Sequence, residues 1–269
     1  MLLNTYHISW LSLSLAYILL AFPLYIFWKY KTGLVKETLI SFARMTLQLA
    51  LVGLYLGLIF NLNNVWINIG WVFIMIGVAT ITTTQRSGLK GRAFFVPVSL
   101  ALLVSIVLID TFFLGAILQL ENFFEARYFI PITGMIIGNC MERNIIALNT
   151  FYDTLTKEYE VYQYYIANGA SRQEALRPFI SEAIQKSFNP LIANTAVIGL
   201  IALPGMMTGQ ILGGSAPGLA IKYQILLMLG IFTASLSTVY ITLRSVTPHL
   251  ISASGILLSK QQVSNKTVK

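Results

Sequence analysis

The sequence predicts an all-α integral membrane protein, a bundle of about seven transmembrane helices with a structured loop on the cytoplasmic side. The composition is 56% hydrophobic and only 10% charged, with a mean hydropathy of +0.73. A soluble protein of 269 residues could not shield so much apolar surface from water. The apolar residues also form continuous runs without the period-two alternation of membrane-barrel strands, which leaves a helix bundle.

The apolar runs define the expected spans, each long enough to cross about 30 Å of hydrocarbon as a helix. In chain order they are Ile8–Trp28, Leu39–Phe60, Val65–Thr83, Phe94–Leu118, Phe129–Leu148, Phe188–Leu212 and Ile221–Leu243. We expect the first run to remain as a span, because no basic segment precedes it and Trp28-Lys29-Tyr30 is typical of an interfacial anchor. One membrane domain, residues 1–269, then accounts for the chain, with a polar tail at residues 260–269.

The basic residues predict the orientation of these spans. Nearly all Lys and Arg residues fall in the connections on one side, and the opposite connections contain only Arg127 and Lys222. Basic residues resist translocation, so we expect the N-terminus outside and the C-terminus in the cytoplasm of a multi-pass protein of the bacterial inner, or cytoplasmic, membrane. The net charge of +8 then reflects topology and contact with anionic membrane lipids, and no nucleic-acid partner is expected.

A polar segment, residues 149–187, interrupts the apolar runs and is expected to form a cytoplasmic loop. Apolar and tyrosine side chains at steps of three and four predict an amphipathic helix over Phe151–Ala167. Asn168-Gly169 then predicts a left-handed stop at the end of this helix. The segment therefore begins with a helix that extends below the fifth span.

A second helix is expected to start in the same segment. Ser171 and Glu174 have the spacing of a capping box. Because Pro178 cannot continue a helix without losing a hydrogen bond and clashing with the preceding turn, the ordered piece should be about two turns long, Ser171–Arg177. Two interpretations remain open: a solvated loop with good local caps, or a coupling helix that docks into another protein. The length and detail of the segment favour docking.

Four motifs follow one another along the chain: Pro131-Ile-Thr-Gly-Met-Ile-Ile-Gly-Asn139, Gly169-Ala-Ser171, Leu203-Pro-Gly-Met-Met-Thr-Gly209 and Ala220-Ile-Lys-Tyr-Gln-Ile225. In sequence and order they resemble the Fet-type iron-export ABC transporter permeases, the family that also includes plant aluminium-tolerance permeases. The motif-bearing similarity covers Phe129–Arg244, and the first four spans match mainly in hydropathy and order.

The resemblance implies a permease that works as a homodimer with a separate cytoplasmic ABC ATPase subunit, which binds the ATP and Mg. The turn of the polar segment would sit in the ATPase surface through its docking residues, Gly169, Ala170, Ser171, Glu174, Ala175 and Arg177. The chain contains no G-x-x-x-x-G-K-[ST] motif for cradling phosphates. We therefore expect no ATPase activity and no bound cofactor in this subunit.

The sixth apolar run contains Pro204 and Gly205, followed by Met206 and Met207. Proline and glycine at membrane depth free backbone groups, which are tolerated where protein or water satisfies them. We expect a broken helix that lines a substrate cavity, with carbonyls as cation ligands. A plain structural kink is the alternative. The two methionines are candidate soft ligands, but flexible packing is their commoner role.

Three further polar residues are candidates for the substrate path. Glu142 lies within the fifth run, where a charge is costly unless it is paired or hydrated. Alternatively, Glu142 forms an ion pair with Arg143 or Arg44 near the cytoplasmic interface. Asp110, expected towards the outer end of the fourth span, either passes a cation outward or snorkels to the interface. Asn139 either lines the path or joins helices.

These observations favour the membrane subunit of an ATP-driven exporter of iron or another metal cation. An ABC permease for a non-metal solute, or an ion-coupled secondary carrier, would fit the same apolar pattern. No metal site is assigned to this chain: His7 and His249 are far apart in sequence, and the lone Cys140 excludes a cysteine cluster. The identity of the substrate and the direction of transport do not follow from the residues themselves.

Overall fold

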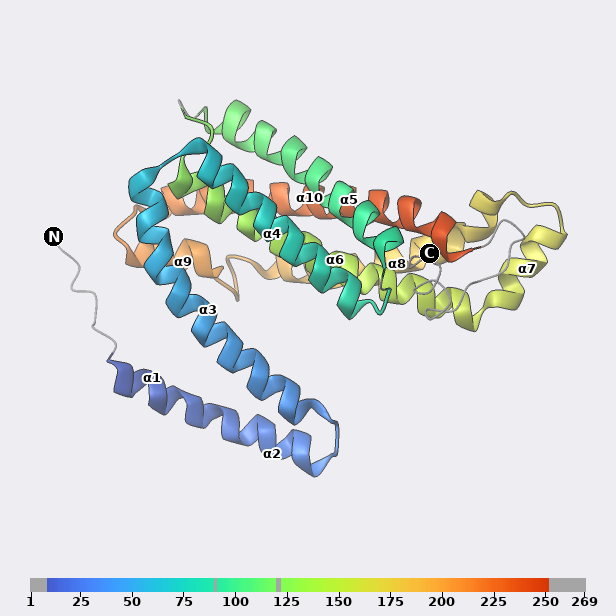
Figure 1. Ribbon diagram of the computed structural model, residues 1–269, viewed down its shortest axis with the longest axis horizontal. Coiled ribbons are helices and arrows are strands. Elements are labelled where there is room, and N and C mark those ends of the chain that lie inside the picture. Colours follow the sequence, from blue (N-terminus) through green and yellow to red (C-terminus); the bar gives the residue numbers. More distant parts are fainter. Residues whose placement is uncertain (1–8, 90, 120–121, 252–269) are drawn as a thin grey trace. The chain divides into compact units, whose positions relative to one another are not determined.

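The computed structural model describes residues 9–89, 91–119 and 122–251. Every regular element in these ranges is helical, apart from an isolated bridge between Ile198 and Ala202 (Figure 1). The prediction of an all-α protein is therefore confirmed. The predicted polar tail at residues 260–269 lies outside the described residues, as does His7. The chain divides into two compact units, one running to Asn63 with Leu212–Gly214, the other made of Asn64–Ile211 and the chain from Ser215.

The first unit is a helical hairpin whose turn depends on left-handed residues. Its elements are α1 (Trp10–Ala16), the 3-10 helix η1 (Tyr17–Leu20), α2 (Ala21–Lys29) and α3 (Leu34–Leu62). Lys31 and Gly33 have φ of 50° and 76° between α2 and α3, a conformation that glycine adopts without strain. The hydroxyls of Tyr17 and Thr46 form a hydrogen bond across the hairpin. Most apolar side chains of α3 are exposed, as expected of a helix that faces lipid.

The second unit is arranged around one long helix, α6 (Figure 1). Its elements are α4 (Val65–Arg86), α5 (Arg92–Asp110), the π-helix η2 (Thr111–Ile117), α6 (Ala126–Lys157), α7 (Tyr159–Ala167), α8 (Arg172–Val197), α9 (Gly205–Leu212) and α10 (Pro217–Leu250). Helix α6 packs against α4, α8 and α10, and α5 packs against α4 and α10. On α6, Leu148, Phe151 and Leu155 follow the spacing of a helical face and are buried. This face supports the polar segment.

Five helical segments among the described residues are long and apolar enough to cross a membrane: Leu11–Lys29, Leu34–Leu62, Val65–Arg86, Arg92–Ile117 and Pro217–Leu250. They match the first four and the last of the predicted runs. The other two runs differ from them. The fifth lies in α6, which also carries Glu142 and Arg143, and the sixth is interrupted between α8 and α9. The count of seven spans is therefore not confirmed.

The predicted end of the second loop helix at Pro178 is wrong, because α8 continues through Pro178 and Pro190. Both prolines lie on the exposed side of the helix, while Leu176 and Phe179 are buried. A proline inside a helix costs about 3 kcal/mol. Packing of the buried side of α8 against α6 offsets this local cost.

The predicted single helix over Phe151–Ala167 is also interrupted. Helix α6 ends at Lys157, Glu158 has a non-helical backbone, and α7 begins at Tyr159. The predicted buried face is nevertheless largely present, because Leu155 and Tyr162 on either side of the break are buried. The break redirects the chain while both pieces keep packing against the protein.

Candidate functional site

The turn between α7 and α8 is closed by its own backbone hydrogen bonds. Gly169 has φ of +88°, and its N–H donates to the carbonyl oxygen of Ile166 at 3.0 Å. The N–H of Ala170 donates to the carbonyl oxygen of Tyr165, also at 3.0 Å. This pair of bonds is a Schellman motif, which satisfies the last carbonyls of α7. The predicted left-handed stop at Gly169 is confirmed.

The start of α8 is closed by side chains. The Ser171 N–H donates to Glu174 Oε2 at 2.8 Å, and the Glu174 N–H donates to Ser171 Oγ at 3.3 Å. The Ser171 hydroxyl also donates to Glu174 Oε2, at 2.6 Å. These bonds form the predicted capping box. The hydrogen bonds from Ser171 hold the pKa of Glu174 below its usual value, so this carboxylate is ionised at neutral pH.

Buried side chains fix this polar turn to the rest of the second unit. Tyr162 of α7 and Ala175 of α8 are both buried. Desolvation raises the pKa of the Tyr162 phenol, so the ring remains neutral in this setting. At the start of α8, Arg172 donates to the carbonyl oxygens of Thr247 and Ile251 at 3.2 and 3.0 Å, which joins the turn to the end of α10.

The predicted docking residues lie in the turn between α7 and α8 and in the first two turns of α8. Gly169, Ser171, Glu174 and Arg177 are exposed, and Ala170 is half-buried. Ala175 is the exception, because its side chain is buried and supports the turn from inside. The sequence analysis did not identify Arg172, whose acceptors are backbone carbonyls more than 70 residues away. The sequence did contain one signal for Arg172: it is a basic residue at the start of a helix, where its charge opposes the helix dipole.

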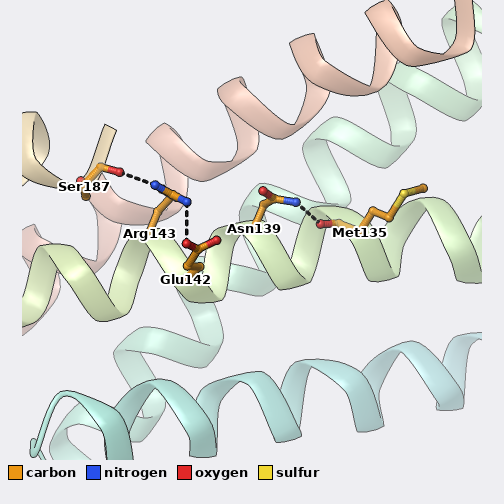
Figure 2. A network of polar contacts seen from close by, with 5 residues as sticks. All are labelled: Met135, Asn139, Glu142, Arg143 and Ser187. Atoms are coloured by element: carbon orange, nitrogen blue, oxygen red, sulfur yellow. Dashed lines mark hydrogen bonds and ion pairs between the residues drawn. The ribbon is translucent and has the colours of Figure 1, made fainter. Parts of the chain in front are cut away.

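Glu142 and Arg143 form an ion pair on α6 (Figure 2). Arg143 Nη2 lies 2.8 Å from Glu142 Oε1, and the Arg143 side chain is 5% exposed while that of Glu142 is 58% exposed. Arg143 Nη1 also donates to the carbonyl oxygen of Ser187 at 2.8 Å. Of the alternatives for Glu142, the pairing with Arg143 is present. Arg143 itself joins α6 to α8, a role that the sequence analysis did not assign.

Asn139 lies one turn before this pair and bonds to its own helix (Figure 2). Its Nδ2 donates to the carbonyl oxygen of Met135 at 2.9 Å. The side chain is only partly buried. It therefore contacts α6 itself here, and the bond leaves the Oδ1 acceptor for another group.

Asp110 is a buried acid at the point where α5 changes to the π-helix η2. Its Oδ2 accepts a hydrogen bond from the Thr133 hydroxyl at 2.6 Å, while Oδ1 has no hydrogen-bond partner among the described residues. Asp110 borders a cavity of about 270 Å³ whose other walls include Phe123, Phe124 and Phe129. A buried carboxylate is costly without a cation nearby, and π-helical turns often mark functional positions.

The break predicted at Pro204 and Gly205 is present between α8 and α9. The N–H of Ile201 donates to the carbonyl oxygen of Val197 at 3.0 Å, and the N–H of Gly199 donates to that of Ala202 at 2.9 Å. The Pro204 carbonyl oxygen accepts from the N–H and hydroxyl of Thr208 at 3.0 and 3.1 Å. Local bonds thus satisfy much of the freed backbone. Met206 is half-buried and Met207 is buried.

The predicted path residues are distributed over three segments: Asp110 on α5, Asn139 and Glu142 on α6, and Pro204–Met207 at the start of α9. Asp110 bonds to Thr133 of α6, but within the described ranges no hydrogen bond or ion pair joins the predicted path side chains to one another. No group of three His, Cys, Asp or Glu residues in the same ranges is placed to hold a metal ion.

Comparison with known proteins identifies the family. The model of an uncharacterised protein family, UPF0014, matches residues 10–251. The chain belongs to the UPF0014 family. The match spans the described part of both structural units. No solved structure shows a significant match to this UPF0014 chain.

Named relatives of this UPF0014 chain come from bacteria and plants. The "Probable iron export permease protein FetB" of Escherichia coli is 30% identical over 90% of this chain and 93% of its own. The "Protein ALUMINUM SENSITIVE 3" of Arabidopsis thaliana is 34% identical over 71% and 69% of the two chains. The "UPF0014 membrane protein YjkA" of Bacillus subtilis is 29% identical over 82% and 86%. The resemblance to the Fet-type permease family is confirmed, and the chain is a member of a membrane permease family.

Proposed function

We propose that this chain is the membrane subunit of an ATP-driven ABC exporter, working as a homodimer with two copies of a separate ATPase. The observation that carries the proposal is the turn at Gly169–Glu174. Schellman and capping-box hydrogen bonds define it, and buried side chains support it. Exposed polar residues on a rigid support suit a surface that receives force from another protein. ATP and Mg would be bound by the ATPase subunit.

The turn has two mechanical connections to the rest of its unit. Arg172 joins the beginning of α8 to the end of α10, and Arg143 joins α6 to Ser187 farther along α8. A displacement of the turn would therefore reach both α6 and α10. When the two ATPase subunits close, their contacts with the turn would favour one arrangement of the helices over the other. The transport cycle would then be a population shift between two states.

The substrate class in this proposal is a metal cation, with iron as the first candidate. The Escherichia coli relative is named a probable iron export permease, which supports iron as the substrate of that protein. In this chain, Asp110 supplies a buried acidic oxygen with no partner among the described residues, and Glu142 supplies an exposed carboxylate on α6. We place Asp110, Asn139, Glu142 and the Pro204–Met207 segment along the path. The cation would be cargo that passes these groups in turn.

The proposed orientation has the turn and the C-terminus in the cytoplasm and the N-terminus outside. The distribution of basic residues supports it. Labelling of Gln163→Cys in a Cys140→Ser background would test it, because Gln163 is exposed on α7 and Cys140 is a buried free cysteine. An impermeant thiol reagent should label this site only from the cytoplasmic side of vesicles. Labelling from the outside would overturn the orientation.

Gly169→Asp tests the docking role. Aspartate tolerates the left-handed backbone better than most residues, and a Cβ at Gly169 would meet open space, so the turn should keep its shape. The added negative charge should abolish co-purification with the ATPase, ATPase stimulation and metal efflux. Gln163→Glu adds the same charge on α7 outside the turn and serves as the control. Full metal efflux by Gly169→Asp would contradict the docking role.

Asp110→Asn tests the path separately. The substitution removes the charge and retains a side chain of similar size, so Thr133 can still form a hydrogen bond with the amide. We expect metal efflux in vesicles to fall while the ATPase still binds. Normal efflux would remove Asp110 from the path. Efflux by the wild-type chain without nucleotide would instead favour a secondary carrier.

A further inference from the structure

A basic cavity lies between the beginning of α8 and the last turns of α10. Its volume is about 430 Å³. Three arginines border it: Arg172 and Arg177 from α8, and Arg244 from α10. Glu174 is the acidic residue in the lining, and its carboxylate already accepts hydrogen bonds from Ser171. The lining therefore carries a net charge of +2, from three arginines and one glutamate.

The arginines have different amounts of unused hydrogen-bonding capacity. Arg172 is engaged by the carbonyl oxygens of Thr247 and Ile251. Arg244 lies over the ring of Tyr240, 5.8 Å from its centroid, and bonds to its hydroxyl only through Nε. Arg177 is exposed and has no acceptor in the described part of the chain. Arg177 and Arg244 therefore offer guanidinium N–H groups to an anion.

The remaining walls of the cavity are largely apolar. Leu176, Ile180, Leu243 and Pro248 contribute to them, and the Tyr240 ring lies beside Arg244. An inorganic anion would use the arginines and leave these walls without a partner. An amphiphile with a phosphate next to a hydrocarbon portion would satisfy both parts of the lining.

We propose that this cavity binds the phosphate headgroup of an anionic phospholipid, with its glycerol and first acyl carbons against the apolar wall. Arginine pairs with phosphate oxygens through two parallel N–H donors, which suits Arg177 and Arg244. Basic pockets between membrane helices are a recognised site for such headgroups. Residues 252–269 contain three lysines and no acidic residue, so their side chains would not neutralise the cavity. The bound lipid would join α8 to α10.

A titration of the purified permease without any ATPase tests this inference. The unfolding temperature is measured in neutral detergent with short-chain phosphatidylglycerol, phosphatidylcholine of the same chain length, or glycerol phosphate. We expect phosphatidylglycerol to raise the unfolding temperature saturably and phosphatidylcholine to change it little. Glycerol phosphate should raise it less than phosphatidylglycerol does. Equal shifts with the two lipids would overturn the proposal. If glycerol phosphate raised the unfolding temperature as much as phosphatidylglycerol does, the site would bind free phosphate compounds and the lipid proposal would be wrong.

Variants at the cavity sharpen the titration. Arg177→Gln and Arg244→Gln should each weaken phosphatidylglycerol binding about fivefold, the approximate value of one basic residue near an anionic lipid. Lys222→Gln, near the opposite end of α10, is the matched control and should bind like the wild type. Arg177 is exposed and has no hydrogen-bond or ion-pair partner in the described part of the chain, so its variant stays informative if Arg244→Gln is unstable. The proposal is wrong if Arg177→Gln binds phosphatidylglycerol as tightly as the wild type does. It is also wrong if phosphatidylglycerol raises the unfolding temperature only after ATPase is added.

The cavity shares Glu174 and Arg177 with the predicted docking residues, but the lipid inference does not rest on the proposed export function. Lipid binding by the purified permease requires neither transport nor ATPase docking. Loss of the phosphatidylglycerol response would therefore leave the docking turn untouched. Conversely, failure of Gly169→Asp to affect ATPase binding would leave the basic cavity unchanged, because Gly169 does not border it.

Discussion

The two ends of α8 use the same backbone conformation in different chemical settings. Gly169 before the helix and Gly199 after it both have φ of +88°. At the first end, Ser171 and Glu174 cap the helix with side-chain hydrogen bonds. At the second end the chain closes through backbone bonds, and Leu200 and Ile201 are 89% and 84% exposed. One end presents polar groups, and the other presents apolar side chains.

This difference indicates what each end can contact. A turn whose polar groups are already satisfied can meet water or a polar protein surface without loss. An end with two exposed aliphatic side chains gains stability where lipid or another apolar surface covers them. We therefore expect the Gly169 end to exchange partners during transport, and the Gly199 end to remain in apolar surroundings.

Matched valine substitutions at the two glycines give the largest expected effect. A β-branched residue is strained at φ of +88°, by about 1–2 kcal/mol, and a Cβ meets open space at both positions. Gly169→Val should lower ATPase stimulation by about tenfold. A cost of about 1.4 kcal/mol for holding the strained turn in its docking conformation lowers the docking affinity by that factor. Gly199→Val should leave ATPase stimulation close to the wild-type value. The measurement is ATP hydrolysis by the reconstituted complex.

The unfolding temperature of the two valine variants is the control, since equal strain should lower it by similar amounts. If Gly199→Val reduced ATPase stimulation as strongly as Gly169→Val, the assignment of docking to one end of α8 would be wrong. If neither variant changed it, the turn would have no part in docking.

Removal of the internal anchor of α8 should have the next largest effect. Arg143→Met keeps the length of the side chain but removes the bond to the Ser187 carbonyl oxygen and the pair with Glu142. A hydrogen bond to a buried charged group contributes about 2 kcal/mol. We expect the free energy of unfolding to fall by about that amount, measured by denaturant titration in detergent.

Lys186→Met is the matched control for the anchor. Lys186 pairs with Glu182 at 2.6 Å on the same helix, but both side chains are substantially exposed. Exposed pairs contribute about 0–1 kcal/mol, so this variant should be nearly neutral. Equal destabilisation by the two variants would show that Arg143 is not a special anchor.

The same contrast explains how much of the structure could be predicted from sequence. The stop at Gly169 and the box formed by Ser171 and Glu174 depend on residues within three or four positions of each other, so their spacing predicts them. The end of the helix at Pro178 was also a local prediction, and it is wrong. Packing of Leu176 and Phe179 in the interior supplies stabilisation that a local rule does not contain.

Long-range polar contacts could not be predicted from the sequence pattern, for a physical reason. Arg143 and Arg172 both donate to backbone carbonyl oxygens, which every residue possesses, so no partner residue type marks the contact. A pairing between Glu142 and Arg143 could be proposed because the two are adjacent in sequence. Asp110 was expected near the outer end of its span, but its hydrogen bond to Thr133 depends on how α5 and α6 pack.

Loss of the serine cap should have a smaller effect, confined to one end of α8. Ser171→Ala removes an acceptor for the Glu174 N–H, and such substitutions cost about 1 kcal/mol. Hydrogen exchange should become faster in the first turn of α8 and remain unchanged near Val197. Thr195→Val is the control at the other end, where the hydroxyl only bonds back to the Leu191 carbonyl oxygen. Faster exchange along the whole helix would contradict a local cap.

Acidification should produce the smallest effect, again at the Gly169 end. Hydrogen bonds from the Ser171 hydroxyl and N–H hold the pKa of Glu174 below its usual 4.5. The contribution of this carboxylate to the cap is therefore complete above pH 4.5 and is lost as the pH falls through the lower folded-state pKa. Hydrogen exchange in the first turn, corrected for the intrinsic rate, should rise only in this acidic range. In Glu174→Gln the acid dependence should disappear, whereas its persistence would assign the titration to another group.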